Sequence, residues 1–200
     1  MTERHVIFDI GGVLVTWKPH LAWVDALGSQ AEAEAFMART DFKARNLRAD
    51  GGARFADLAA ELADNEDRAL FAQYVPQYAR TVTDKIDGSW ALMHRLRSES
   101  VPVHAITNWS AETWPEGLKA QPELEDAFDT LVISGREGVL KPEARIFHIL
   151  CERAGVAPEQ CIFVDDSLGN VTGACAVGMD GIHFTSPQRL EADLQQRGML

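Results

Sequence analysis

The sequence has few cysteines, and they are not spaced as a metal or disulfide motif. Its three cysteines are Cys151, Cys161 and Cys175. Their number is odd and no two form a C-x-x-C pair, which argues against a disulfide framework and a structural zinc site. We interpret all three as small buried hydrophobic residues in a reducing compartment.

Basic residues and long apolar runs are also scarce. The chain has 19 Lys and Arg residues against 30 Asp and Glu residues, a formal net charge of −11, and an acidic surface repels nucleic acid and anionic membranes. No stretch approaches the roughly 20 apolar residues that cross a bilayer, and the chain starts without the regions of a signal peptide. The sequence therefore predicts a cytoplasmic protein without nucleic-acid or membrane partners.

Five short apolar segments predict the strands of a parallel β-sheet. They are almost continuously apolar, which is typical of strands covered by helices on both faces. Because helical patterns separate them, we predict an α/β fold with a doubly wound parallel sheet. The five segments are His5–Asp9, Val101–Thr107, Thr130–Ser134, Cys161–Val164 and Gly181–Phe184.

Amphipathic patterns between these segments predict helices. One helix follows Asp87–Ser89 and places its apolar residues on one stripe. A second begins at Pro142, a residue suited to a first helical position, and stops at Gly155. A third runs from Leu168 to Val177. These helices provide the covering layers that a doubly wound sheet requires.

The region from residue 17 to residue 85 breaks this alternation. It shows no strand pattern, only helical stripes such as the one formed by Phe55, Leu58 and Leu62. We therefore predict that residues 1–16 and 86–200 form an α/β core and that residues 17–85 form a helical cap inserted after the first strand. Insertions at the carboxyl ends of strands lie over the crevice where open α/β sheets bind ligands.

Acidic residues stand at the ends of two predicted strands. Asp9 ends the first, and Asp165-Asp166 follows the fourth. Because the carboxyl ends of parallel strands converge on one edge, we expect these carboxylates to share a pocket. Asp9 would supply a nucleophile, and Asp165 and Asp166 would supply the hard oxygen ligands that Mg²⁺ prefers.

Other residues at the same edge suit a phosphate group. Thr107 offers a hydrogen-bond donor and Lys141 a fixed positive charge for phosphate oxygens. Gly11 and Gly12 let the backbone approach a ligand closely and offer N–H groups to an oxyanion. Phosphoryl transfer needs this combination of positioning, charge neutralisation and nucleophile.

The segments F-D-I-G-G-V-L-V, I-T-N, K-P-E-A-R-I-F and F-V-D-D-S-L-G-N, in this order and spacing, resemble the four motifs of the haloacid dehalogenase superfamily. With the helical insertion, the chain resembles the subgroup with a small α-helical cap, which includes sugar-phosphate phosphatases. Its D-x-G first motif resembles that of glucose-1-phosphate-type phosphatases. The resemblance implies a Mg²⁺-dependent hydrolase that acts on a small phosphorylated metabolite through an aspartyl-phosphate intermediate.

The resemblance also implies roles for individual residues. Asp9 would be the nucleophile and a metal ligand, and the Gly11 carbonyl and Asp166 would be further ligands. Asp165 would support the metal directly or through water. Lys141 would bridge the phosphoryl group and the nucleophile. Thr107 and Asn108 would hold the phosphoryl group, and Asn170 lies at a position where a second acidic residue often stands. Apart from the resemblance, we expect Gly12, Trp17, His20 and Asn170 to contact the substrate, Trp17 as a wall near the start of the cap and His20 as a group that reaches in from the cap.

The first motif departs from the superfamily at one position. Gly11 stands where phosphatases usually carry a second Asp, which acts as general acid and then as base. General acid–base catalysis contributes about 10²–10⁴ in rate. Three explanations stay open: a substrate with a good leaving group, such as an anomeric or acyl phosphate; a substitute group such as His20; or a slow or inactive enzyme.

Two other functions compete with the phosphatase. A 2-haloacid dehalogenase would use the same nucleophile without metal, but the Asp165-Asp166 pair would repel its carboxylate substrate. A non-catalytic binding protein would keep the metal site without turnover. A phosphomutase is less favoured because it also relies on the acid that Gly11 replaces. Nothing in the sequence fixes the oligomeric state.

Overall fold

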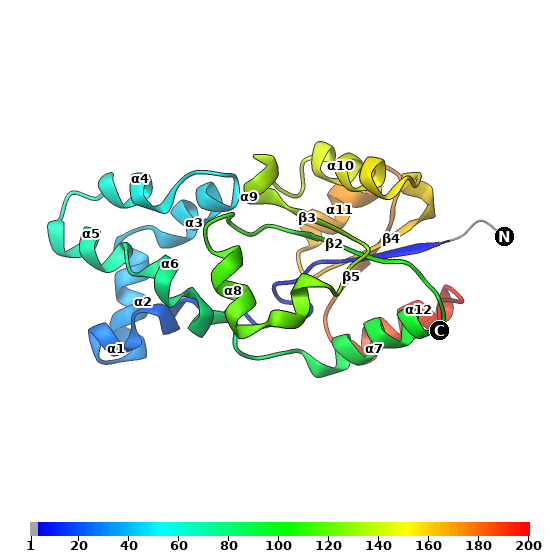
Figure 1. Cartoon of the computed structure of the whole chain (residues 1–200), viewed down its shortest axis with the longest axis horizontal. Coiled ribbons are helices and arrows are strands. Elements are labelled where there is room, and N and C mark those ends of the chain that lie inside the picture. The colour runs from blue at the N-terminus through cyan, green and yellow to red at the C-terminus, as the bar shows by residue number, and fades with distance from the viewer. Residues whose placement is uncertain (1–3) are drawn as a thin grey trace.

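Five parallel strands form one sheet in the order β3-β2-β1-β4-β5. The computed structural model describes residues 4–200. The strand order confirms the predicted doubly wound sheet, and each strand lies within two residues of its predicted range (Figure 1). The strands are β1 His5–Phe8, β2 Val103–Thr107, β3 Thr130–Ile133, β4 Cys161–Asp165 and β5 Asp180–His183.

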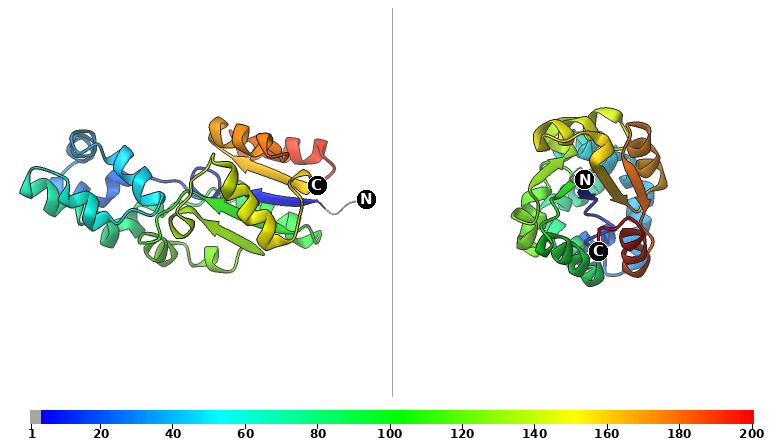
Figure 2. Two further views of the ribbon diagram at one scale, coloured as in Figure 1. Left: turned by 90° about the horizontal axis from the view of Figure 1, so that it is seen from above. Right: turned by 90° about the vertical axis from the view of Figure 1, so that its right-hand side faces the viewer.

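Helices cover both faces of this sheet. α7 and α12 lie side by side on one face, and α10 and α11 lie on the other (Figures 1 and 2). The short 3-10 helices η3 and η4 precede β3 and β4. The bounds are α7 Asp87–Ser98, α8 Trp114–Ala120, η3 Pro122–Glu125, α9 Ser134–Glu137, α10 Ala144–Ala154, η4 Pro158–Gln160, α11 Leu168–Ala176 and α12 Pro187–Gln196.

The apolar character of the strands follows from this layering. Val6 and Phe8 of β1 belong to the hydrophobic cluster beneath α7 and α12, whereas Ile7 belongs to the cluster that contains Phe147 of α10. Successive side chains of a strand point to opposite faces. Because both faces are covered, every residue of β1 is buried, as a continuous apolar run predicts.

α10 begins two residues later than predicted. The prediction that Pro142 is its first residue is wrong: Pro142 lies in the preceding loop, and α10 starts at Ala144. Pro142 packs closely against α11, because a Cβ added at Gly173 would come within 2.6 Å of its carbonyl oxygen. Gly155 ends α10 as predicted, with a left-handed φ of 70° that suits glycine.

Two of the three cysteines are buried as predicted. Cys151 and Cys161 lie in the core, but Cys175 is exposed, so the prediction for Cys175 is wrong. The inward face of α11 is formed by Val171 and Ala174, and Cys175 lies outside it. All three cysteines are free.

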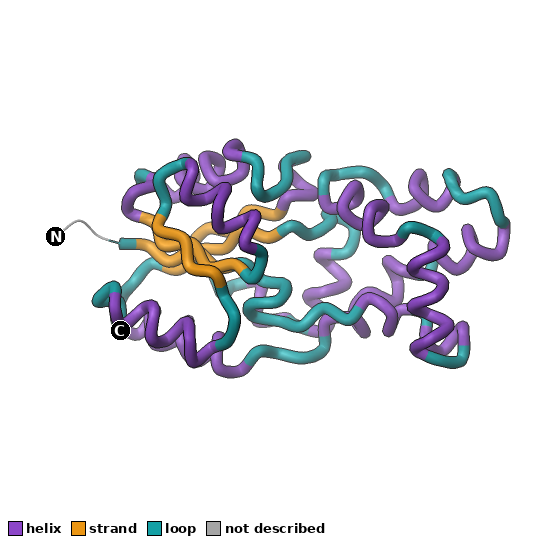
Figure 3. The backbone as a smooth tube through the Cα atoms, turned by 180° about the vertical axis from the view of Figure 1, so that it is seen from behind, coloured by secondary structure: helices purple, strands orange, loops and turns teal. Residues whose placement is uncertain are grey.

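The chain between β1 and α7 folds into a helical segment that extends beyond the carboxyl ends of the strands (Figures 1 and 3). Its centre is aromatic: Tyr74 packs on Trp23 and Phe42 at ring-centroid distances of 5.1 and 4.7 Å. The predicted stripe residues Phe55 and Leu58 are buried there. The elements are η1 Pro19–Ala22, α1 Val24–Leu27, α2 Gln30–Arg39, α3 Phe42–Asp50, α4 Phe55–Ala60, α5 Asn65–Phe71, α6 Tyr74–Gln77 and η2 Tyr78–Val82.

The two connections between this segment and the sheet run next to each other. The Thr16 N–H donates to the Asp84 carbonyl at 2.9 Å, and the Ile86 N–H donates to the Leu14 carbonyl at 2.8 Å. These bonds tie the chain leaving β1 to the chain entering α7, and so fix where the helical segment joins the sheet.

The helices are short. The longest, α7, has 12 residues, compared with about 20 for a bilayer span. Within residues 4–200, no helix combines the length and apolar character needed to cross a membrane.

A buried histidine pair makes stability depend on pH. His104 of β2 stacks on His5 of β1, with His104 Nε2 3.0 Å from His5 Nδ1. Burial, followed by the neighbouring His5, lowers the pKa of His104 from 6.5 to about 4. Between these values the unfolded chain binds a proton that the folded chain does not, so stability is lost as pH falls.

We therefore expect His104→Gln to remove part of the acid sensitivity. From pH 7 to pH 4, the unfolding free energy of the native protein should fall by about 3 kcal/mol more than that of this variant. Urea denaturation at several pH values measures this difference, in which groups common to both proteins cancel. His148→Gln, at an exposed position, is the control. Parallel stability curves for His104→Gln and the native protein would contradict the expectation.

Candidate active site

Asp9 is the first residue after β1, and the backbone holds it at the strand end. Its N–H donates to the Val164 carbonyl at 2.8 Å, which continues the pairing of β1 with β4. Its Oδ1 accepts the Ile10 N–H at 2.7 Å and lies 2.8 Å from Lys141 Nζ. Both donors bind Oδ1, so within the described part of the chain Oδ2 is the oxygen left to react.

Lys141 places a buried positive charge beneath Asp9. Its Nζ lies 2.8 Å from Asp9 Oδ1 and 2.7 Å from Asp165 Oδ2, and it donates to the Ile106 carbonyl at 2.9 Å. These acceptors match the three protons of an ammonium group. Burial lowers the pKa of Lys141, but Asp9 and Asp165 together raise it above its ordinary value. Lys141 is therefore a fixed cation in the floor of the site.

Asp165 is fully buried, and hydrogen-bond donors contact both of its carboxylate oxygens. Besides Lys141, its oxygens accept the Ser167 N–H at 2.8 Å and the Asn170 Nδ2 at 3.0 and 3.1 Å. Asn170, predicted to contact substrate, thus lies against Asp165 and is not among the residues that line the cavity. Its side chain orients Asp165, which in turn holds Lys141.

Three carboxylates meet at this edge of the sheet. Asp9, Asp165 and Asp166 each offer an oxygen within 4.8 Å of the others. Burial raises the pKa of Asp9, an effect that Lys141 opposes and Asp165 reinforces. Burial and then Asp165 also raise the pKa of Asp166. One lysine does not neutralise three carboxylates, and hard oxygen donors at this spacing fit a divalent cation such as Mg²⁺.

The two glycines after Asp9 differ in their surroundings. Gly12 has a left-handed φ of 80°, and a Cβ added there would lie 2.3 Å from Asp166 Oδ2. Its N–H donates to the Val15 carbonyl at 2.8 Å and is therefore engaged within the loop, not free for an oxyanion. Gly11 also lines the cavity, and a Cβ there would meet no atom within 4 Å. Gly12 thus makes room for Asp166, whereas Gly11 leaves open space.

This difference gives a matched pair of substitutions. We expect Gly12→Ala to displace Asp166, to lower stability by about 1–3 kcal/mol, and to weaken Mg²⁺ binding by about 10–100-fold. Gly11→Ala should change stability by less than about 0.5 kcal/mol. Thermal unfolding with increasing Mg²⁺ measures both quantities. Equal behaviour of the two variants would contradict the role given to Gly12.

Thr107 and Asn108 follow each other at the end of β2. Thr107 is buried and lines the cavity. Asn108 also lines it, but both polar atoms of its side chain bind the backbone of Lys141: Nδ2 donates to the Lys141 carbonyl at 3.1 Å, and Oδ1 accepts the Lys141 N–H at 2.9 Å. Asn108, predicted to hold a phosphoryl group, therefore also positions the lysine.

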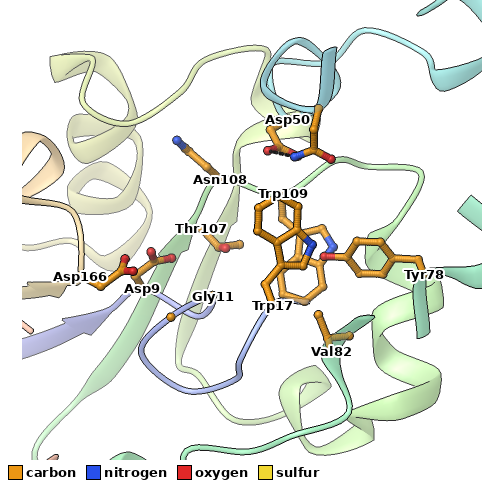
Figure 4. A pocket seen from close by; sticks show the side chains of 12 residues that line it. Asp9, Gly11, Trp17, Asp50, Tyr78, Val82, Thr107, Asn108, Trp109 and Asp166 are labelled. Carbon is orange, nitrogen blue, oxygen red and sulfur yellow. Dashed lines mark hydrogen bonds between the residues drawn. The ribbon is translucent and has the colours of Figure 1, made fainter. Parts of the chain in front are cut away.

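A cavity of about 300 Å³ opens above Asp9, between the sheet edge and the helical segment (Figure 4). Trp17, predicted to contact the substrate, is among the residues that line it, with 41% of its surface exposed and its Nε1 donating to the Tyr74 hydroxyl at 3.1 Å. His20 is not among the lining residues. The cavity is also lined by residues that the sequence did not identify as part of the site: Asn46, Asp50, Tyr78, Val82 and Trp109.

Asp50 is the lining carboxyl that comes from the helical segment. It is the last residue of α3, and its Oδ2 accepts the Asn46 Nδ2 at 2.8 Å. Burial raises the pKa of Asp50 well above its ordinary value. The hydrogen bond from the Ser110 N–H opposes this rise, and the negative charge of Asp9 adds to it. One sequence signal was present: Asp50 precedes Gly51-Gly52, an acid followed by two glycines, much as Asp9 precedes Gly11-Gly12.

Comparison with known proteins gives consistent matches. The family model for haloacid dehalogenase-like hydrolases matches residues 3–178. The chain is 28% identical over 202 residues to the sesquiterpene phosphatase astK of Aspergillus oryzae, covering 98% of this chain and 96% of that protein. It is 27% identical over 192 residues to the fructose-1-phosphate phosphatase YqaB of Escherichia coli, covering 91% and 97%. The crystal structure of the HAD family enzyme bt-2542 from Bacteroides thetaiotaomicron, a magnesium complex, is similar with a TM-score of 0.71 at 22% identity, covering 93% and 95%.

Proposed function

The chain belongs to the haloacid dehalogenase-like hydrolases, and from this premise we propose that it is a Mg²⁺-dependent phosphatase that acts on a small phosphorylated metabolite through an aspartyl-phosphate intermediate. The observation that carries the proposal is the arrangement around Asp9: one oxygen bound by Ile10 and Lys141, the other left to react beside Asp166. We also propose that residues 17–85 act as a cap over a core of residues 1–16 and 86–200.

In the proposed reaction, Asp9 Oδ2 attacks phosphorus and the bond from phosphorus to the leaving oxygen breaks. Lys141 favours the ionised form of Asp9 and balances charge on the transferred group. The Thr107 hydroxyl, at the same end of the cavity, donates to a phosphoryl oxygen. Asp9, Asp166 and the Gly11 carbonyl would hold a divalent ion, which would neutralise charge on the phosphate oxygens. Water then hydrolyses the aspartyl phosphate.

The charge of the cavity argues against the dehalogenase. The residues that line the cavity include the carboxylates Asp9 and Asp166, and none of those described is a lysine or an arginine. A free carboxylate substrate would enter without a cationic partner in a metal-free reaction. A phosphate ester would meet the same repulsion unless a cation shielded the carboxylates, and the three-carboxylate cluster is suited to hold one.

The same lining favours a substrate whose remaining part is uncharged. Asp50, on the wall that faces Asp9, and its hydrogen-bond partner Asn46 offer polar groups, and Trp17 offers an apolar face. Sugar hydroxyls suit the first two groups and a sugar ring suits the third. We therefore propose a sugar phosphate as the substrate class, in line with the similarity to a fructose-1-phosphate phosphatase.

A panel of sugar phosphates tests the proposal. We expect release of inorganic phosphate that requires Mg²⁺, stops with EDTA and returns when Mg²⁺ is added in excess. Halide release from 2-haloacids in EDTA would instead identify a dehalogenase. Mg²⁺-dependent binding of beryllofluoride without turnover of any phosphate ester would identify a non-catalytic binding protein.

A further inference from the structure

Breaking a phosphate ester leaves an oxygen that needs a proton. An alkoxide is a poor leaving group, so a general acid at this oxygen accelerates the reaction by about 10²–10⁴. Gly11 provides no such group, because it has no side chain and the space beside it is open. The cavity wall opposite Asp9 must therefore be searched for the donor.

We propose that Asp50 is the catalytic acid and base: it protonates the leaving oxygen and then takes a proton from the attacking water. This inference rests on the proposed phosphatase function. Asp50 lines the same cavity as Asp9 and comes from the opposite wall (Figure 4). A group on that wall faces the departing side of a phosphoryl group that Asp9 attacks from below, as an in-line displacement requires.

Hydrogen bonds fix Asp50 in this place. Its backbone carbonyl accepts the Ser134 hydroxyl at 2.6 Å, which ties the end of α3 to the end of β3 in the sheet. Its Oδ2 accepts the Asn46 amide at 2.8 Å. The Ser110 backbone N–H also donates to the Asp50 carboxyl. Asn46 is thus a positioning residue for the donor.

The surroundings also favour the protonated form. Burial raises the pKa of Asp50 well above the ordinary value of a carboxyl; the hydrogen bond from the Ser110 N–H opposes this rise, and the negative charge of Asp9 adds to it. A carboxyl whose pKa is raised holds its proton more firmly than an ordinary one, and is suited to donate it when negative charge develops on the leaving oxygen. The electrostatic surroundings of Asp50 therefore support the role of general acid that its position indicates.

Other groups in or near the cavity are less suited. Lys141 is bound by three acceptors and lies below Asp9. Asp166 lies on the Asp9 side of the cavity, in the carboxylate cluster. Burial raises the pKa of Tyr78 well above that of an ordinary phenol, which makes it a poor acid. His20, the candidate from sequence, is not among the lining residues.

The two half-reactions balance. In the first, Asp9 Oδ2 forms a bond to phosphorus, the bond to the ester oxygen breaks, and the Asp50 proton passes to that oxygen, giving an alcohol and an Asp50 carboxylate. In the second, the Asp50 carboxylate removes a proton from water, the hydroxyl oxygen bonds to phosphorus, and the bond to Asp9 breaks. Inorganic phosphate leaves, Asp9 is again a carboxylate and Asp50 is again protonated.

The test compares leaving groups in the full-length protein with Mg²⁺. For Asp50→Asn we expect kcat/KM to fall by about 10²-fold or more on phenyl phosphate, and by less than about tenfold on 4-nitrophenyl phosphate, whose phenolate leaves without a proton. Because the base is also removed, phosphate should accumulate on Asp9 in Asp50→Asn and be detected by mass spectrometry. The substitution keeps the shape of the side chain and one oxygen as an acceptor, and the far-UV and near-UV circular dichroism spectra check the fold.

Tyr78→Phe is the control, because it removes the hydroxyl of another residue that lines the cavity and should keep the native dependence on leaving group. The inference is overturned if Asp50→Asn loses the same factor on both esters, or if Tyr78→Phe shows the selective loss instead. Either result leaves the phosphatase proposal standing. Native protein that hydrolyses neither ester, nor any sugar phosphate, would overturn the phosphatase proposal and this inference with it.

Discussion

Asp9→Asn is expected to abolish phosphate release while leaving the fold at least as stable as that of the native protein. Loss of a covalent nucleophile lowers kcat on the order of 10⁴-fold or more. The amide keeps the shape of the side chain and an oxygen for the Ile10 N–H, but it does not attack phosphorus. Phosphate release with Mg²⁺ measures the first part of this expectation.

The stability part follows from the pKa of Asp9. Burial raises this pKa, so the fold disfavours the charged form, and the resulting stability is lost as pH rises above the ordinary value of 3.8. An amide carries no charge and avoids the loss, while Lys141 keeps Asp165 and the Ile106 carbonyl as partners. In EDTA at pH 8, Asp9→Asn should therefore melt no lower than the native protein.

Asp165→Asn is the matched control for this contrast. Its new amide group would face the Asn170 amide and the Ser167 N–H, both of which are donors. A buried donor placed against donors costs about 1–3 kcal/mol. We therefore expect Asp165→Asn to melt well below the native protein. If Asp9→Asn were destabilised as much, or if it kept native turnover, the nucleophile assignment would be wrong.

The fold was predictable because its signals are local. A strand buried on both faces must be apolar along its length, so runs such as His5–Phe8 and Cys161–Asp165 stand out in the sequence. The parallel arrangement then brings their carboxyl ends together without further information. This is why the proximity of Asp9, Asp165 and Lys141 was expected before any coordinates.

The rest of the site depends on contacts that no local pattern encodes. Asp50 enters the cavity because the aromatic centre of the helical segment and the Ser134 bond set the position of α3. Asn108 and Asn170 were recognised as polar residues in the right place. Their partners, the Lys141 backbone and the Asp165 carboxylate, follow from side-chain directions that spacing does not determine.

The largest expected effect on stability comes from Lys141→Met. Met keeps most of the apolar stem but removes the charge that Asp9 and Asp165 share at 2.8 and 2.7 Å. Removing one partner of a buried ionic cluster costs about 3–5 kcal/mol, because the remaining charges lose their compensation. We expect this loss in urea denaturation at pH 8 in EDTA, together with loss of phosphate release.

The remaining carboxylates give this variant two further properties. Without the lysine, Asp9 loses the charge that holds its pKa down and folds most easily when protonated, so the stability deficit should shrink as pH falls from 8 to 5. A divalent cation should partly replace the missing charge, so Mg²⁺ should raise the melting temperature of Lys141→Met more than that of the native protein. Lys119→Met, which removes an exposed charge paired with Glu116, should change stability by less than about 1 kcal/mol. A deficit that neither acid nor Mg²⁺ reduces would mean that Lys141 acts by packing, and the carboxylates around Asp9 would then not be the charge that a metal ion offsets.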